Sequence, residues 1–279
     1  MMFDRTANVR PKTKKRLASG QTVEFSAQDE KMLRAAYDYM QGFAKRRLFD
    51  QKLSTVGDEL EKFESSVSIR IRERCSIVSP EKSNKRTGSA VAVVGATPIL
   101  LDVNSGDLSA EEESLLEELN RHKAESSALE EKYAEFLRID QSISMKDVET
   151  LMHVLGVSPS KQVIQHMIYE VDEMVDEMVS WDEFLLTYYR NVTDISGCEP
   201  CSFFRIMEFV VFDPHHKGRI VEDDVMEVLF ARIGAARLED ELQAIFGNNR
   251  RAKGGDGTIS LQQYLDACLV KNGRRSLVC

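Results

Sequence analysis

The segment between residues 172 and 183 carries oxygen-bearing side chains at intervals that suit a calcium ion. Asp172, Asp176, Ser180 and Glu183 stand at positions 1, 5, 9 and 12 of a twelve-residue loop. Calcium loops take oxygen ligands at these positions, with a bidentate Glu at position 12. The type and spacing of these residues therefore make the loop a candidate metal site.

Two other residues of this loop weaken the site. Met174 stands at position 3, where calcium needs an oxygen, and a thioether is too soft a ligand for it. Glu177 stands at position 6, where a left-handed turn favours glycine, and we expect its Cβ to resist that turn. Calcium binding here is therefore expected to be weak or absent.

A later loop, residues 213–224, has the same length and fewer ligands. Asp213 and Asp224 stand at its first and last positions, and they are less convincing ligands than the carboxylates of the earlier loop. His215 occupies position 3, and Lys217 places a cation at position 5, where an oxygen ligand should stand.

The first and the last loops of the series have lost most of their ligands. One register of the first loop puts Phe136 and Arg138 at positions 1 and 3, and a register that begins at Asp140 is four residues short. The last loop has Gln263 at position 12 and an insertion over residues 248–253. Neither loop is expected to hold a metal.

Other chemistry finds little support in the sequence. Cys198 and Cys201 form a CxxC pair, but redox work would require a strand–helix context that this chain does not show. Zinc would require two further ligands, and the adjacent His215 and His216 cannot easily both join that pair. P-loop, nucleophile-elbow, HExxH and kinase motifs are absent from the sequence. We therefore expect no catalytic residues and no enzyme.

Around these loops the sequence resembles the EF-hand family. Four loop–helix segments follow one another in two pairs, and this arrangement makes the resemblance strong over residues 130–271. It implies an all-α fold with two paired EF-hand lobes, at 130–190 and 191–271. The apolar residue at loop position 8 should pair the loops of each lobe through short β bridges, Ile143 with Val179 and Ile220 with Ile259. The four matching segments are 142–156, 168–185, 209–229 and 256–265.

Within that family, residues 197–234 are most similar to EF-hand proteins of flagellar axonemes. This similarity implies a non-enzymatic subunit of a microtubule-associated assembly in the cytoplasm, in the cytoskeleton of a cilium or flagellum. Degenerate hands in such a subunit would act as adaptors for other proteins and would need no cofactor.

The N-terminal arm, residues 1–26, is basic on an otherwise acidic chain. It contains six Lys or Arg residues against two acidic ones, whereas the whole chain has a net charge of −9. A basic arm suggests tubulin or another acidic protein surface as partner, and a solubilising tail is an equally good interpretation. The candidate contact residues of the arm are Arg10, Lys12, Lys14, Lys15 and Arg16.

Residues 27–75 are predicted to form one long helix or two broken ones. Ser26 and Asp29 have the spacing of a capping box at its start. Apolar residues then recur at intervals of four and three, which predicts a coiled-coil-like seam that needs a partner, either another chain or the protein's own body. The seam residues are Phe49, Leu53, Val56, Leu60, Phe63 and Val67.

A linker and a further helix separate this region from the hands. Residues 76–108 are interrupted by Pro, Gly and basic residues and are expected to be extended, although residues 90–103 are apolar and could form a short strand or plug. Residues 109–139 should form a helix that leads into the first hand, with a seam made partly polar by His122 and Ser126. Residues 272–279 are expected to be a tail.

Composition excludes several functional classes. The chain has 279 residues, 37 Lys and Arg and 46 Asp and Glu, so a nucleic-acid coat is not expected. The longest apolar run is 12 residues, which is too short to span a membrane, and no secretory signal is visible. The five scattered cysteines do not form a disulfide framework, in agreement with a cytoplasmic location.

Two functions from different classes follow from these observations. The first is an EF-hand adaptor with little or no calcium binding in a large assembly. The alternative is a calcium-responsive regulator that binds a target helix and uses residues 172–183 as its metal site.

Overall fold

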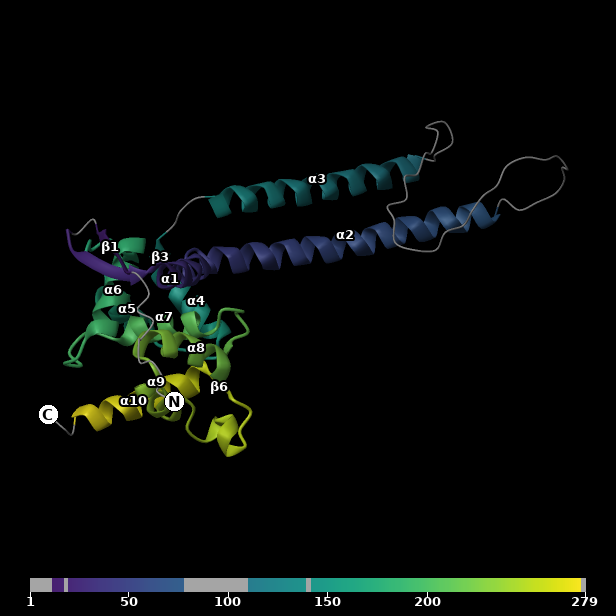
Figure 1. Cartoon of the computed structure of the whole chain (residues 1–279). Coiled ribbons are helices and arrows are strands. Elements are labelled where there is room, and N and C mark those ends of the chain that lie inside the picture. Colours follow the sequence, from purple (N-terminus) through teal and green to yellow (C-terminus); the bar gives the residue numbers. More distant parts are fainter. Residues whose placement is uncertain (1–11, 18–19, 78–109, 139–141, 277–279) are drawn as a thin grey trace. The chain divides into compact units, whose positions relative to one another are not determined.

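The computed structural model describes residues 12–17, 20–77, 110–138 and 142–276, and these are mostly helical (Figure 1). The described part contains ten α-helices and three two-stranded antiparallel sheets. The predicted all-α fold class is therefore confirmed. Within the described part, no helix combines the length and apolarity that crossing a bilayer requires.

The chain divides into two units, one of residues 1–46 with 140–279 and one of residues 47–139. Most of the predicted linker lies outside the described residues, including the apolar stretch 90–103. The predicted tail is helical as far as Ser276, because the last helix continues to that residue.

The first unit begins with a β-hairpin where the sequence analysis expected only an arm. Strand β1 (Lys12–Arg16) pairs antiparallel with β2 (Thr22–Ser26), and Lys14 lies opposite Glu24. Val23 and Phe25 of β2 are buried, so the hairpin is attached to the core through this face. Helix α1 (Ala27–Met40) follows directly, and the predicted Ser26–Asp29 capping box is present at its start.

The region predicted as one long helix or two broken ones consists of two helices. Helix α1 ends at Met40, and α2 (Phe43–Ile77) begins after a break at Gln41 and Gly42. Gly42 has φ 61°, a left-handed value that costs glycine little, so it permits the change of direction. Gly57, a second glycine of this region, lies within α2 and does not interrupt it.

Four hands follow, of which hands two to four are helix–loop–helix units and hand one consists of a strand and the helix after it, and residues 142–276 that contain them are called the hand body below. Lobe one contains hand one, with β3 and α4, and hand two, with α5, β4 and α6. Lobe two contains hand three, with α7, β5 and α8, and hand four, with α9, β6 and α10. The bounds are β3 Ile143–Ser144, α4 Met145–Val154, α5 Lys161–Tyr169, β4 Met178–Val179, α6 Trp181–Thr193, α7 Ser202–Phe212, β5 Arg219–Val221, α8 Glu222–Ile233, α9 Ala235–Phe246, β6 Thr258–Ser260 and α10 Leu261–Ser276.

The two predicted β bridges are confirmed residue by residue. Ile143 pairs with Val179 in lobe one, and Ile220 pairs with Ile259 in lobe two. All four side chains are buried. The insertion 248–253 forms two short 3-10 turns before β6, Gly247–Asn249 and Arg251–Lys253.

The second unit contains an antiparallel pair of helices, the part of α2 from residue 47 onward and α3 (Ala110–Arg138) (Figure 1). Phe49 near one end stacks on Tyr133 at 5.2 Å between ring centroids, and Phe63 lies 5.7 Å from His122. As the number rises along α2, the contact residue on α3 falls, which fixes the antiparallel direction.

The predicted seam of α2 therefore contacts α3 of the same chain, a helix that was not singled out when a partner within the protein itself was left open. The first five seam residues are half-buried, and the α2 residues between them are exposed. The side chain of Val67 lies outside the described set.

Charge reversal in the seam should open this helix pair and leave the hand body folded. In a Leu60→Asp, Phe63→Asp double variant, two carboxylates would replace apolar contacts on α3. We expect a lower helical signal in circular dichroism with an unchanged emission maximum of Trp181, the single tryptophan, which lies in the hand body. A matched Glu59→Ala, Glu61→Ala variant of exposed α2 residues should keep the full helical signal.

Candidate functional site

The loop of hand two brings the four predicted ligands together, and its own backbone already binds them. Asp172 accepts hydrogen bonds from the N–H groups of Asp176 at 3.2 Å and Glu177 at 2.8 Å. Glu183 accepts from the N–H of Met174 at 3.0 Å and from the N–H of Ser180 at 2.8 Å. Ser180 and Glu183 form a capping box for α6, so Ser180 has a structural role.

Two non-glycine residues of this loop adopt left-handed backbone conformations. Glu177 has φ 63°, so the left-handed turn forms with Glu in place, and its Cβ makes this conformation less favourable than it would be for glycine. Val175 at position 4 has φ 57°, which is uncommon for a β-branched side chain. The side chain of Met174 is 70% exposed and offers sulfur where a metal would need oxygen.

The loop of hand three has the same backbone hydrogen bonds to its first carboxylate, but it has fewer side chains that could bind a cation. Asp213 is buried and accepts from the N–H groups of Lys217 at 3.0 Å and Gly218 at 2.7 Å. His216 at position 4 has φ 52°, the counterpart of Val175. Asp224 lies in the first turn of α8, where a carboxylate stabilises the helix N-terminus without a metal.

The insertion in the loop of hand four supplies a positive charge from the protein itself. Arg250 is buried, and its Nε donates to Glu222 at 2.8 Å; it also forms an ion pair with the exposed Glu239. The N–H of Arg251 binds the second oxygen of Glu222 at 2.9 Å. Burial would raise the pKa of Glu222, but these donors hold it below its ordinary value. At position 12, Gln263 accepts from the N–H of Ser260 without any charge.

The residues present do not form a complete calcium set. Among the residues that the structure describes, no three His, Cys, Asp or Glu side chains are placed to hold a metal ion. Asp140 of the first loop lies outside them. Loop 172–183 comes nearest, with carboxylates at three of its ligand positions and sulfur at a fourth.

A second feature, the packing of α1 against the hand body, was not predicted from the sequence; it is called the seat of α1 below. The residues of α1 that face the body are Leu33, Ala36, Tyr37 and Met40, all buried, at the i, i+3, i+4, i+7 spacing of a helix in a groove. The helix packs against α4, α6 and α7, so it contacts both lobes.

Tyr37 is the central anchor of this seat. Its ring lies 5.2 Å from Trp181 and 5.2 Å from Phe184, both edge to face. Its hydroxyl donates to the carbonyl of Val179 at 3.3 Å, so it reaches the β bridge of lobe one. Val179 also pairs with Ile143, and one strand thereby links the two loops of the lobe and α1.

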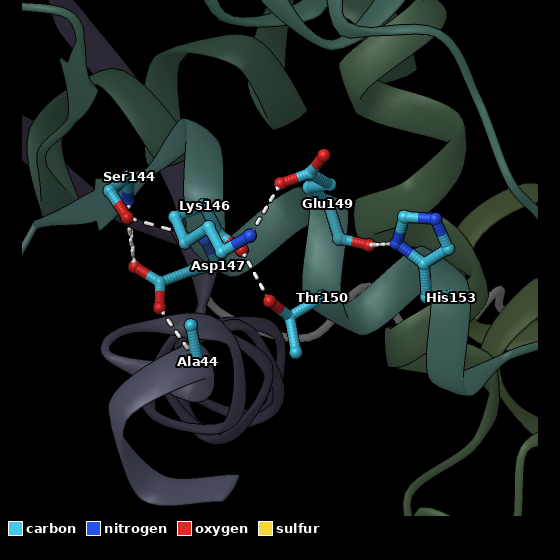
Figure 2. A network of polar contacts seen from close by, with 7 residues as sticks. All are labelled: Ala44, Ser144, Lys146, Asp147, Glu149, Thr150 and His153. Carbon is cyan, nitrogen blue, oxygen red and sulfur yellow. Dashed lines mark hydrogen bonds and ion pairs between the residues drawn. The ribbon is translucent and has the colours of Figure 1, made fainter. Parts of the chain in front are cut away.

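Asp147 joins the hand body to the start of α2 (Figure 2). Its Oδ2 accepts from the N–H of Ser144 at 2.9 Å and from the Ser144 hydroxyl at 2.6 Å, which completes the capping box of α4. Its Oδ1 accepts from the N–H of Ala44 at 2.8 Å, in the first turn of α2. This buried carboxylate therefore caps two helices that are 103 residues apart in sequence.

The other residues in Figure 2 lie on the outer part of α4. Lys146 and Glu149 form an ion pair at 2.9 Å, and its hydrogen bond lowers the pKa of Glu149. Because these groups are solvated, the pair contributes little to stability.

A stacked pair holds the end of α1 against hand three. The ring of Tyr39 lies parallel to His216, with centroids 3.6 Å apart and an interplanar angle of 3°. The guanidinium of Arg46 donates to the carbonyl of Tyr39. Burial lowers the pKa of His216, Asp213 opposes this effect, and the charges of Arg46 and His215 add to it. The neutral imidazole is therefore favoured in the folded protein.

The basic hairpin lies beside Trp181. The ammonium group of Lys15 lies 5.4 Å from the indole ring and 3.8 Å from the carboxylate of Asp182. Lys14 pairs with Glu24 at 3.1 Å, and Arg16 is exposed. Arg10 lies outside the described residues.

A hydrogen bond of Arg232 connects the two lobes. It lies in α8 of lobe two and donates to Tyr188 of lobe one at 2.9 Å and to Glu208 at 2.5 Å. Tyr264 donates to the other oxygen of Glu208 at 2.5 Å. Burial raises the pKa of Tyr188 and of Tyr264, so both phenols remain protonated, Tyr188 as the acceptor from Arg232 and Tyr264 as the donor to Glu208.

Comparison with known proteins supports the hand assignment. No family model matches the chain. Calglandulins of Pseudechis porphyriacus, Notechis scutatus scutatus and Bothrops insularis are each 27% identical to it over 125 residues, which is 44% of this chain and 75% of the relative. Calglandulin is an EF-hand protein, so this distant similarity indicates the EF-hand family. None of these relatives points to an axonemal protein.

Removal of the Asp147 carboxylate should destabilise the first unit strongly. In Asp147→Ala, the N–H groups of Ser144 and Ala44 would lose their acceptor. We expect the free energy of unfolding to fall by about 2–4 kcal/mol, since each helix loses a cap in a buried place. Urea titration followed by Trp181 fluorescence measures this change. Glu149→Ala on the same helix should cost less than about 0.5 kcal/mol.

Protonation of His216 should weaken the folded state. Its folded-state pKa lies below the unfolded value of about 6.5, so its contribution is complete above about pH 6.5 and is lost as the pH falls through the folded value. His216→Asn keeps a residue that tolerates φ 52° and removes the titration. Urea titrations between about pH 7.5 and about pH 5 should show a smaller fall in stability in the variant. Equal falls would contradict this assignment.

Proposed function

We propose that this protein is a non-enzymatic EF-hand adaptor whose hand body is permanently occupied by its own helix α1. The observation that carries the proposal is the seat of α1, with its four anchors and its contacts to both lobes. A regulator that captures a target helix needs a free apolar groove. In this chain, a covalently linked helix fills the corresponding surface at very high effective concentration.

The loops support the same function. The carboxylates that would attract calcium in hands two and three accept hydrogen bonds from backbone N–H groups instead. In hand four, the last ligand is an amide, and Arg250 supplies positive charge from within the chain. The fold of these loops is consequently expected to be independent of calcium.

The link between the lobes is a further argument for a static role. Tyr188, Glu208 and Arg232 form a buried polar network that spans both lobes. Separation of the lobes around a target would break the hydrogen bond from Arg232 to Tyr188 and leave a buried phenol without this donor, which is costly, although the Arg232–Glu208 ion pair lies wholly within lobe two. A body of this kind is suited to present fixed surfaces to other proteins.

We infer the cellular setting from the sequence alone. The similarity of residues 197–234 to axonemal EF-hand proteins favours a microtubule-associated assembly of a cilium or flagellum, in the cytoskeleton of the cytoplasm. Other proteins of that assembly, tubulin among them, are the proposed partners.

The alternative is a calcium-responsive regulator that uses loop 172–183. Its support is the placement of Asp172, Asp176 and Glu183 at three ligand positions, together with the indicated EF-hand family. In this alternative, calcium would have to displace the backbone N–H groups that bind the carboxylates of the loop. It would also have to break the contacts of Tyr37 with lobe one, so that α1 leaves the hand body.

A calcium titration by calorimetry distinguishes the two functions. We expect no binding heat from the unmodified protein in the range of cellular sensors, about 10⁻⁷–10⁻⁵ M. Met174→Asp with Glu177→Gly should create binding in hand two, because it supplies the missing oxygen and relieves the strained turn. Adding Glu183→Gln to this double variant is the control and should abolish the heat. Micromolar binding by the unmodified protein, with a shift in Trp181 emission, would establish the regulator instead.

A further inference from the structure

Strand β1 has one edge that no other described strand covers. It pairs only with β2, in a sheet of two strands. In an antiparallel pair, alternate residues of an outer strand direct their N–H and C=O groups away from the neighbour. This edge is therefore a template on which another extended chain can form backbone hydrogen bonds.

The register of the hairpin separates its two faces. Val23 and Phe25 are buried, and Lys15, opposite Val23, lies on the same inner face beside Trp181. Lys14 and Arg16 alternate with Lys15, so they lie on the outer face, and both are exposed.

The outer face of β1 is cationic on an acidic protein. Lys14 has a side chain that is 74% exposed, and its partner Glu24 lies at 3.1 Å. An exposed pair of this kind is weak and exchanges readily with a competing carboxylate. The whole chain carries a net charge of −9, so this strand is a local exception that favours an acidic ligand.

We propose that β1 binds an acidic, extended peptide segment of a partner protein by strand addition. Backbone groups of the partner would pair with the open edge of β1, and its carboxylates would contact Lys14 and Arg16. This inference rests on the adaptor function proposed above. It restricts the proposed contact site of the basic arm to two side chains and one strand edge. Lys15 is excluded, because Asp182 and Trp181 already engage it.

Lysine on an edge strand also protects proteins against aggregation, and this role makes a different prediction. A purely protective edge repels every added strand. A recognition edge repels copies of itself by like charge and accepts a strand of opposite charge.

The test measures binding of labelled heptapeptides to the full chain by fluorescence anisotropy. The probe alternates Glu with Thr, so that its glutamates can lie on one face of an added strand. We expect saturable binding that weakens about tenfold or more between about 0.05 M and about 0.5 M salt. The same peptide N-methylated on alternate backbone nitrogens should not bind, because it cannot complete the ladder. A Lys–Thr heptapeptide should also fail to bind.

Matched variants locate the site. Lys14→Glu with Arg16→Glu should weaken binding about tenfold or more, whereas Arg237→Glu with Lys253→Glu makes the same change of net charge in hand four and should leave it unchanged. Glu24→Gln removes the internal competitor of the peptide and should strengthen binding about threefold. Unchanged Trp181 emission and circular dichroism confirm that each variant is folded.

Several results would overturn the proposal. Absence of binding by the Glu–Thr peptide would leave a protective edge. Equal binding of the N-methylated peptide would show charge attraction without strand addition, and loss of binding only in the hand-four variant would place the site elsewhere. Binding to phosphatidylserine vesicles in place of the peptide would identify a lipid surface instead. Failure of this proposal leaves the calcium titration unaffected, so it can be told apart from failure of the adaptor function.

Discussion

The carboxylate of Asp147 is the interaction on which the arrangement of the first unit depends. A buried carboxylate is stable only when donors surround it, and Asp147 obtains them from Ser144 in hand one and from Ala44 at the start of α2. Each helix N-terminus in turn needs an acceptor. This mutual need fixes where α2 begins, and the break at Gln41 and Gly42 follows from it, because α1 has to end before that point.

Helix α1, which precedes this junction in the chain, covers the apolar surface of the hand body. In the chain, the helix that precedes β3 is α3, which belongs to the other unit, so hand one has no entering helix of its own within the first unit. Helix α1 supplies apolar surface to α4, α6 and α7, and Tyr37 reaches the β bridge at Val179. A helix more than 100 residues away from β3 in sequence thus covers the apolar surface of the hands.

The predictable parts of this molecule are those encoded locally. The capping box at Ser26 and the bridge residues Ile143, Val179, Ile220 and Ile259 follow from spacings within one loop or one helical turn, and the structure contains all of them. The seat of α1, the stack of Tyr39 on His216 and the pairing of Arg250 with Glu222 join distant residues through shape and burial. The spacing of the buried residues of α1 indicates an apolar helix face, but no local spacing identifies the distant surface that this face contacts. Part of the role of Asp147 is visible in the sequence, since Ser144 lies three residues before it in the spacing of a capping box.

In the proposed adaptor, an internal cation and backbone donors would take over the role that calcium has in such loops. A ligand that binds only the folded state adds stability that depends on its concentration, so a calcium-dependent hand weakens when calcium falls. A guanidinium such as that of Arg250 is part of the chain and is present at all calcium levels. Backbone donors to Asp172 and Asp213 act in the same way within their loops. If the adaptor function proposed above holds, the body would keep a constant shape under changing calcium, which is the property that a fixed component of an assembly requires and a sensor must avoid.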